Sequence, residues 1–250
     1  MGYAEYINEI SFKVLQPNVS VEEFLKYNAW VKGAITSGQS IRELEVLNTR
    51  IPGDAGESIK KLYELLKIPR MSTFAIAVII NKAVSLIRDD LSYVNVGVWN
   101  GFTLLSGMVN NLEKICIGVD DFSQFGGPRK AFLERFNKHK SGTHYFYDMD
   151  YREYFLNFHQ GMIGAYLYDG GHSYENQFEG LRVAEPFFSD GCVVFVDDTN
   201  WSDPKSATLD FISQSPNRYN ILLDRGTCHN RHPTFWNGIM VLQFHKNEKL

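Results

Sequence analysis

Two short acidic stretches of the 250-residue chain hold the side chains that are best suited to chemistry. In the first, Asp169 and His172 flank two glycines directly after an apolar run, in a sequence that favours a turn. In the second, the pair Asp197 and Asp198 follows another apolar run. A turn that only joined two elements would not need a carboxylate and an imidazole three positions apart. These four residues are therefore the candidate reactive groups.

The three aspartates predict a metal site. Carboxylates gathered in a partly desolvated cleft repel one another unless a cation lies among them. Oxygen ligands favour a hard divalent ion, with Mg²⁺ expected first and Ca²⁺ or Mn²⁺ as alternatives. Asp169, Asp197 and Asp198 are the predicted ligands. The alternative for each of them is structural, because aspartate also commonly caps a turn or a helix.

His172 is the predicted general base, and it is grouped with Asp169 as a catalytic residue. An unperturbed imidazole has a pKa close to ambient pH, so His172 can take a proton from a group held at the metal. The alternative is a loop histidine that is held by a backbone group.

The elements that must position these residues follow a regular pattern from residue 91 onward. Short apolar segments alternate with helical segments, which is typical of a doubly wound, mostly parallel sheet covered on both faces. The predicted strands are 93–96, 114–119, 144–147, 165–168, 192–196, 220–223 and 239–244. The predicted helices between them are 102–112, 128–138, 174–187 and 204–213. No helix separates the last two strands, so we expect an α/β fold with a seven-stranded sheet whose last strand is antiparallel.

Residues 1–90 carry weaker patterns. Helices are expected over 21–32, 41–47 and 59–66, and a further helix is expected to begin at Ser72 as its N-cap. We expect residues 1–90 to form a helical extension or lid, and residues 91–250 to form the main domain.

A glycine-containing turn follows the first predicted strand of the sheet. It has the form Gly97-x-x-x-Gly101-x-Thr103, with Trp99 between the glycines. Glycine lets a ligand approach the backbone, and the start of the next helix favours electron-rich ligand atoms. The alternative is a plain tight turn. The sequence has neither GxGxxG nor GxxxxGK[ST], so dinucleotide and triphosphate binding have no positive support.

Acidic residues also follow the second and third predicted strands. Asp120 lies 23 residues after Gly97, close to the spacing at which a Rossmann-like fold hydrogen-bonds a ribose diol, and Asp121 could do the same. Asp148 and Asp150 follow the third strand. Ligands of open α/β sheets bind at the carboxyl ends of the strands, so these acids and the glycine turn are expected to converge there.

From Leu91 to about Phe244 the chain resembles the class I S-adenosylmethionine-dependent methyltransferases. The resemblance implies that Gly97, Trp99, Gly101 and Thr103 hold the methionine part of the cofactor, Asp120 and Asp121 its ribose, and Asp150 or Asp148 its adenine. Asp169 is assigned to both the cofactor and the metal. One departure is Asn95, because many members carry an acid two residues before the first glycine.

The stretches "YDGGHSYENQ" and "VDDTNW" look like those of the macrocin O-methyltransferases and the broader cephalosporin-hydroxylase-like group. In that group an aspartate and an acidic pair bind Mg²⁺, and the histidine is the general base. The first acid of the pair is often Glu there. The resemblance implies methyl transfer from S-adenosylmethionine to a hydroxyl of a sugar or natural-product type of small molecule, with Asn200 and Trp201 lining its pocket. It also implies that the N-terminal segment forms lids and oligomer contacts, so a homo-oligomer is expected.

Two alternatives stay open from the sequence. A metal-dependent hydrolase would use the same aspartates to activate water, but it would leave Gly97 and Asp120 without a role. A non-catalytic protein of the methyltransferase fold would explain Asn95, but it would have no need for clustered carboxylates.

The composition of the chain narrows the class of protein and its cellular location. Hydrophobic residues at 44%, charged residues at 22% and a net charge of −4 are typical of a globular protein and disfavour general nucleic-acid binding. The longest apolar run beside a helix is 74–80, far short of the ~20 residues of a membrane span. Cys116 and Cys192 lie in apolar strands, where buried free thiols are expected. We therefore expect a cytoplasmic protein.

Overall fold

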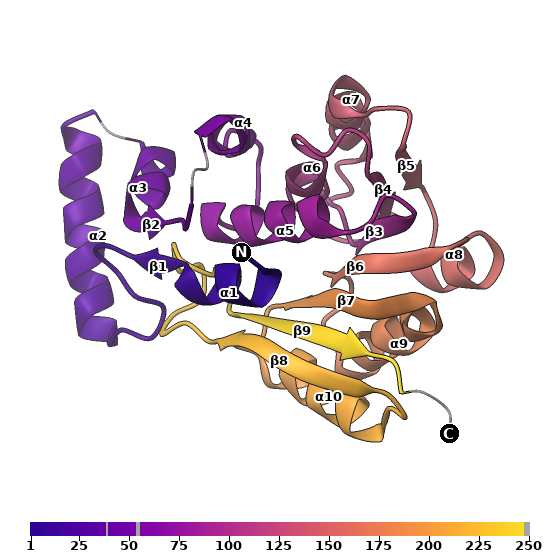
Figure 1. Ribbon diagram of the computed structural model, residues 1–250. Helices are drawn as coiled ribbons and strands as arrows, with labels where there is room; N and C mark the ends of the chain where they lie inside the picture. The colour runs from indigo at the N-terminus through magenta and orange to yellow at the C-terminus, as the bar shows by residue number, and fades with distance from the viewer. Residues whose placement is uncertain (39, 54–55, 248–250) are drawn as a thin grey trace.

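A seven-stranded mixed sheet forms the centre of the computed structural model, which describes residues 1–38, 40–53 and 56–247 (Figure 1). Its strand order is β5-β4-β3-β6-β7-β9-β8. The strands are β3 (Leu91–Val96), β4 (Ile115–Val119), β5 (His144–Tyr147), β6 (Met162–Tyr168), β7 (Phe188–Asp197), β8 (Arg218–Arg225) and β9 (Ile239–His245). The first five are parallel to one another, and β9 is antiparallel to both β7 and β8. The predicted α/β fold with an antiparallel last strand is confirmed.

Helices cover both faces of this sheet, because successive strand residues point to opposite faces and both sets are apolar. Tyr93 belongs to the cluster that also contains residues of α1, α5, α6 and α7, whereas Val94 belongs to the cluster with residues of α8, α9 and α10. The helices of the first face are α1 (Tyr3–Glu9), α5 (Phe74–Leu86), α6 (Phe102–Met108) and α7 (Arg129–His139). Those of the second face are α8 (Tyr151–Asn157), α9 (Tyr174–Ala184), which continues as the 3-10 turn η1 (Glu185–Phe187), and α10 (Ser202–Gln214).

The N-terminal region adds a second, smaller group of elements. They are β1 (Ser11–Phe12), α2 (Val21–Thr36), α3 (Ile41–Asn48), β2 (Thr49–Arg50) and α4 (Gly56–Leu65). Capping boxes at Ser20 and Ser40 begin α2 and α3, which explains why these helices start where they do. Figure 1 shows α2 at the end of the molecule that is farthest from α8. Because α1 and α5 share the core of the sheet, the N-terminal residues are not all peripheral; the division at residue 90 stays a prediction.

Several local expectations need correction. The connection between β5 and β6 contains α8, which the sequence did not predict, and the short strands β1 and β2 were also not predicted. Helix α6 ends at Met108 rather than at residue 112. Helix α5 is capped by Thr73, whose hydroxyl accepts a hydrogen bond from the Ile76 N–H, and not by Ser72. Cys116 and Cys192 are buried free thiols, as predicted.

Substitutions at two helical glycines can test how tightly the helices pack. A Cβ at Gly180, in the middle of α9, would lie 2.2 Å from the ring of Tyr168, whereas a Cβ at Gly33 in α2 would meet nothing within 4 Å. We expect Gly180→Ala to lower the free energy of unfolding by about 1–3 kcal/mol through overpacking. Gly33→Ala should raise it by up to about 1 kcal/mol, because alanine favours the helix. Urea unfolding of both variants measures these shifts, and shifts of the same sign would contradict the packing described here.

Candidate functional site

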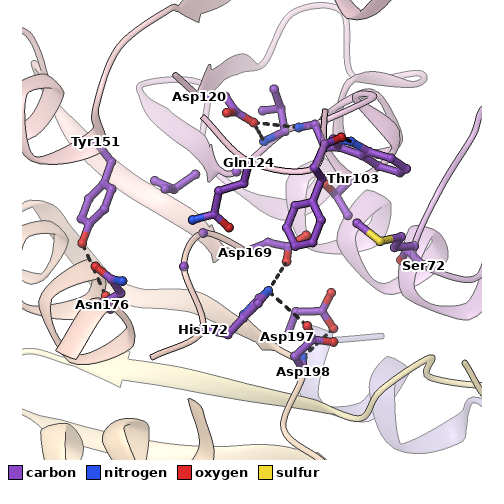
Figure 2. A pocket seen from close by; sticks show the side chains of 18 of the residues that line it. Ser72, Thr103, Asp120, Gln124, Tyr151, Asp169, His172, Asn176, Asp197 and Asp198 are labelled. Carbon is purple, nitrogen blue, oxygen red and sulfur yellow. Dashed lines mark hydrogen bonds and ion pairs between the residues drawn. The ribbon is translucent and has the colours of Figure 1, made fainter. Parts of the chain in front are cut away.

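A cavity of about 730 Å³ opens at the carboxyl ends of the parallel strands (Figure 2). Its walls include the residues that directly follow β3, β4, β5, β6 and β7. Two further segments complete it, the α4–α5 loop around Arg70 and the β8–β9 loop from Asn230 to Asn237. The cavity therefore lies where ligands of open α/β sheets usually bind.

Most predicted site residues meet in this cavity. Those that line it are Gly97, Trp99, Thr103, Asp120, Asp121, Asp150, Asp169, His172, Asp197 and Asp198. Asp169 comes from the end of β6, and Asp197 and Asp198 come from the end of β7, which pairs with β6 as expected.

Gly101 and Asp148 do not line the cavity. Gly101 has φ 93°, and a Cβ on it would lie 2.9 Å from the ring of Phe132, so this glycine is needed for helix packing. The carboxylate of Asp148 is paired with Arg129. Asp150 lines the cavity, but it also caps α8 by accepting a hydrogen bond from the Arg152 N–H at 2.8 Å.

Gly97 joins the glycine turn to the acidic end of β6. Its φ is 80°, and a Cβ would lie 1.9 Å from the backbone oxygen of Asp169. The two strand ends are held together because the Asp169 N–H donates to the Val96 carbonyl at 2.9 Å. No residue with a side chain fits at this position.

Asn95 has a structural role under this turn. Its amide oxygen accepts from the hydroxyls of Thr103 at 2.8 Å and Tyr93 at 3.4 Å, and its NH₂ donates to the carbonyls of Val96 and Gly97 at 3.2 Å each. Its side chain is fully buried and does not line the cavity. A carboxylate could not donate to the two carbonyls, which is a physical reason for Asn at this position.

Asp120 holds the opposite side of the same turn. Its Oδ2 accepts from the N–H groups of Val98 and Trp99 at 2.8 Å each, and its Oδ1 accepts from the Phe122 N–H at 2.7 Å. A carboxylate has about four acceptor positions, so these bonds leave room for about one more. The neighbouring Asp121 accepts one hydrogen bond, from the Ser123 N–H at 2.9 Å.

The acids at the ends of β6 and β7 interact strongly. Burial first, and then the charges of Asp197 and Asp198, raise the pKa of Asp169 well above its ordinary value. Burial and the neighbouring Asp198 likewise raise the pKa of Asp197. Burial raises the pKa of Asp198, while the adjacent His172 opposes this rise. Such a cluster favours the binding of a cation or a proton.

His172 lies between these acids, as Figure 2 shows. Its Nε2 is 3.1 Å from Oδ2 of Asp198 and 3.9 Å from Oδ1 of Asp169. The ring makes an edge contact with Trp201, with centroids 5.3 Å apart. Burial lowers the pKa of His172, and Asp198 partly opposes this effect.

The carboxylate oxygens of this cluster are suitable ligands for a hard divalent cation, but they do not point toward one common position. Among residues 1–38, 40–53 and 56–247, no group of three or more His, Cys, Asp or Glu side chains has the arrangement of a metal site. The Oδ1 atom of Asp197 accepts from the Asp198 N–H at 2.9 Å, and Asp198 contacts His172. A metal would therefore require these side chains to reorient.

The β8–β9 loop reaches the site through residues that the sequence did not single out, Asn230, Arg231, Trp236 and Asn237. Asn237 hydrogen-bonds the side chain of Asp198 and accepts from the Arg231 N–H at 2.9 Å. Asn200 joins the same loop to the end of β7 through its NH₂ bond to Thr227 at 2.8 Å. Arg231 and Trp236 have φ values of 63° and 53°, and both line the cavity.

The α4–α5 loop was also missed. Arg70 and Ser72 line the cavity although they precede the sheet by about 20 residues in sequence. The pattern of the sequence could not place them, because the expected N-cap role explained Ser72 and nothing singled out Arg70.

Comparison with known proteins identifies the class. Residues 94–199 match the family described as "Methyltransferase domain". No curated protein matches the sequence. With the sheet order above, the match shows that these residues form a class I, S-adenosylmethionine-dependent methyltransferase domain.

Solved structures share the fold at low sequence identity. A proposed O-methyltransferase from Klebsiella pneumoniae has a TM-score of 0.56 at 11% identity, covering 78% of this chain and 92% of that one. A proposed caffeoyl-CoA O-methyltransferase from Staphylococcus aureus has a TM-score of 0.53 at 10% identity, covering 88% and 99%. A proposed rRNA methylase from Clostridium thermocellum has a TM-score of 0.52 at 10% identity, covering 68% and 97%. These likenesses show the shared fold.

Across the described residues, the helices are too short or too polar to cross a bilayer.

The structural role of Asn95 can be tested by Asn95→Asp, with Asn28→Asp on the exposed side of α2 as the matched control. We expect Asn95→Asp to lower the free energy of unfolding by about 1–3 kcal/mol at neutral pH, because two carbonyls each lose the hydrogen bond from the Asn95 NH₂ and an unpaired carboxylate is buried. The loss should be full above the raised native pKa of the new acid, and it should shrink as the pH falls toward the unfolded value of about 4. Denaturant unfolding at several pH values measures this. A loss no larger than that of the control would contradict the role of Asn95.

Proposed function

We propose that this protein is a Mg²⁺-assisted O-methyltransferase that transfers a methyl group from S-adenosylmethionine to a hydroxyl of a small molecule. One observation carries the proposal. The acids Asp169, Asp197 and Asp198, together with His172, line the same cavity as the glycine turn and Asp120.

The cofactor half of the cavity is formed by the ends of β3 and β4. S-adenosylmethionine supplies an activated methyl group when it is bound. Gly97 leaves the backbone of the turn open to it, and Thr103 lines the same wall. Asp120 retains limited acceptor capacity and Asp121 retains more, so the two together would hold the ribose hydroxyls.

The metal half is formed by the ends of β6 and β7. Asp169, Asp197 and Asp198 would hold Mg²⁺, which lowers the pKa of a bound hydroxyl and fixes its oxygen. The raised pKa values of Asp169 and Asp197 support this role, because a bound cation would offset both the burial and the mutual repulsion that raise them.

His172 would act as the general base. Its Nε2 faces the carboxylates, and the edge contact with Trp201 restricts the orientation of its ring. The proton of the acceptor hydroxyl would move to the imidazole of His172, which would leave the acceptor oxygen ready to take the activated methyl group that the cofactor supplies. Correct positioning of the two reactants can contribute ~7–11 kcal/mol to lowering the barrier.

A small acceptor fits this cavity better than a nucleic acid. The volume of about 730 Å³ lies within the range of small-molecule sites. Six aspartates line the cavity, and the whole chain carries a net charge of −4, which would repel a phosphate backbone. Trp201 and Trp236 offer aromatic surfaces for a ring-containing acceptor.

The hydrolase alternative again leaves the glycine turn and Asp120 without a role. The non-catalytic alternative draws some support from Asp120, because three of its acceptor positions are occupied by backbone N–H groups. The clustered acids and His172 have no function in that alternative.

The role of His172 predicts a separation of binding from turnover. We expect His172→Ala to bind S-adenosylhomocysteine within about threefold of the wild type while methyl transfer falls by about 10²–10⁴-fold. Calorimetry measures the first quantity, and transfer of labelled methyl to a panel of catechols, sugars and hydroxy acids measures the second. His139→Ala, at an exposed histidine of α7, is the control. Full transfer by His172→Ala would exclude it as the base.

The proposed metal site predicts that removing one carboxylate changes the stability of the protein in opposite directions with and without Mg²⁺. Asp197→Asn keeps the oxygen that accepts the Asp198 N–H but removes one of the clustered charges. We therefore expect this variant to be more stable than the wild type in chelator. Mg²⁺ should stabilise the wild type by about 3 kcal/mol at a hundredfold excess over its Kd, and the variant by much less.

Thermal unfolding in EDTA and in MgCl₂, with NaCl matched for ionic strength, tests this expectation. No stabilisation of the wild type by Mg²⁺, Mn²⁺ or Ca²⁺ would remove the metal from the proposal.

A further inference from the structure

The α4–α5 loop carries a guanidinium that is held in one orientation at the cavity wall. Arg70 donates from Nη1 to the Leu66 carbonyl at 3.1 Å and from Nη2 to Oε1 of Glu45. Its guanidinium carbon lies 5.7 Å from the centre of the Phe102 ring, at the start of α6. Arg70 therefore lies close to the helix that follows the glycine turn.

Glu45 fixes this arginine from behind. The Glu45 side chain is only 6% exposed, and its Oε2 accepts from the Phe74 N–H at 3.1 Å. The same carboxylate thus bonds both Arg70 and the first residue of α5. A buried ion pair with a second hydrogen bond to the backbone keeps the guanidinium in place before any ligand arrives.

Two donors beside the cavity have no partner. The Nε of Arg70 and the hydroxyl of Ser72 are buried, and neither has a hydrogen-bond partner among the described residues. Ser72 is 4% exposed, and its hydroxyl is not used for capping because Thr73 caps α5. A buried polar group without a partner is costly, and it commonly marks a site at which a ligand or water completes the bonding.

Asn95 cannot serve the amino-acid end of the cofactor. All of its hydrogen-bonding capacity is used inside the protein, and its side chain does not line the cavity. Recognition of this end must come from other residues. The unpaired donors of Arg70 and Ser72 suit a carboxylate, because a guanidinium fork and a hydroxyl can both donate to its oxygens.

We infer that Arg70 and Ser72 bind the carboxylate of the amino-acid part of S-adenosylmethionine, and that Glu45 is the positioning residue for Arg70. The inference rests on the proposed function, because it concerns the same cofactor. The charges of the cavity agree with it. Of the other two arginines on the wall, Arg152 is already paired with Asp150, and Arg231 lies on the β8–β9 loop. The aspartates that line the cavity would repel an anion.

Two ligands can distinguish recognition of the carboxylate from recognition of the rest of the cofactor. S-adenosylhomocysteine carries the amino-acid part, whereas 5′-methylthioadenosine has the same adenosine and thioether without it. In calorimetry, we expect Arg70→Met to weaken the binding of S-adenosylhomocysteine by about 10–100-fold, and Ser72→Ala to weaken it by about 3–10-fold. Binding of 5′-methylthioadenosine should change by less than about twofold in both variants, because neither donor contacts it. Arg152→Met is the matched control, and it should change the affinities for the two ligands by the same factor.

Arg70→Met leaves Glu45 buried without its cation, so the variant could unfold. The double variant Glu45→Gln/Arg70→Met keeps this position neutral, and we expect it to show the same selective loss. Unchanged affinity for S-adenosylhomocysteine in the double variant and in Ser72→Ala would overturn the inference, as would an equal loss for both ligands. Failure of the wild type to bind either ligand would instead overturn the proposed function, and this inference with it.

Discussion

The contact between the ends of β3 and β6 is the constraint on which the rest of the site depends. The backbone of Gly97 lies so close to Asp169 that no side chain fits between them, and the Asp169 N–H closes the contact through the Val96 carbonyl. Because β3 and β6 are central neighbours, this contact places a cofactor-type turn beside the acidic end of the next strand. Asn95 below the turn and Asp120 beside it then hold the open backbone in shape. Two different chemistries thus meet in one cavity because two parallel strands end at the same level.

The charges in the cavity are distributed unevenly. Burial and neighbouring carboxylates raise the pKa values of Asp169 and Asp197 at one end of the cavity. Two of the three arginines on the walls are paired with carboxylates, Arg70 with Glu45 and Arg152 with Asp150. The protein therefore creates a strong demand for positive charge at one place and restrains its arginines elsewhere. In the proposed function, this separation would let one cavity accept both a cation and the carboxylate of a neighbouring ligand without the two exchanging places.

The strand pattern of the sequence was sufficient to predict the sheet, its antiparallel end and the convergence of the acids. Uniformly apolar strands bounded by glycine and aspartate are a local signal, and parallel topology brings their carboxyl ends together. Local sequence signals failed to predict the role of a residue where contacts with distant parts of the chain determine that role. Gly101 resembled a ligand glycine but packs against Phe132, and Ser72 resembled a helix cap although its neighbour Thr73 takes that position. Arg70 and Trp236 could not be placed, because the loops that carry them are set by contacts with distant elements.

The two asparagines that tie the β8–β9 loop to the end of β7 have a consequence for how such an enzyme can diverge. Asn237 touches both Asp198 and the backbone of Arg231, and Asn200 holds Thr227 and Asn230. The hairpin that would face an acceptor is thus fastened to an acid that would hold the reacting oxygen. Grafting this hairpin from another enzyme would also disturb that acid, unless both asparagines were transplanted with it. In the proposed function, acceptor selectivity and reactivity would therefore be mechanically coupled, and they would evolve independently only through residues outside this hairpin.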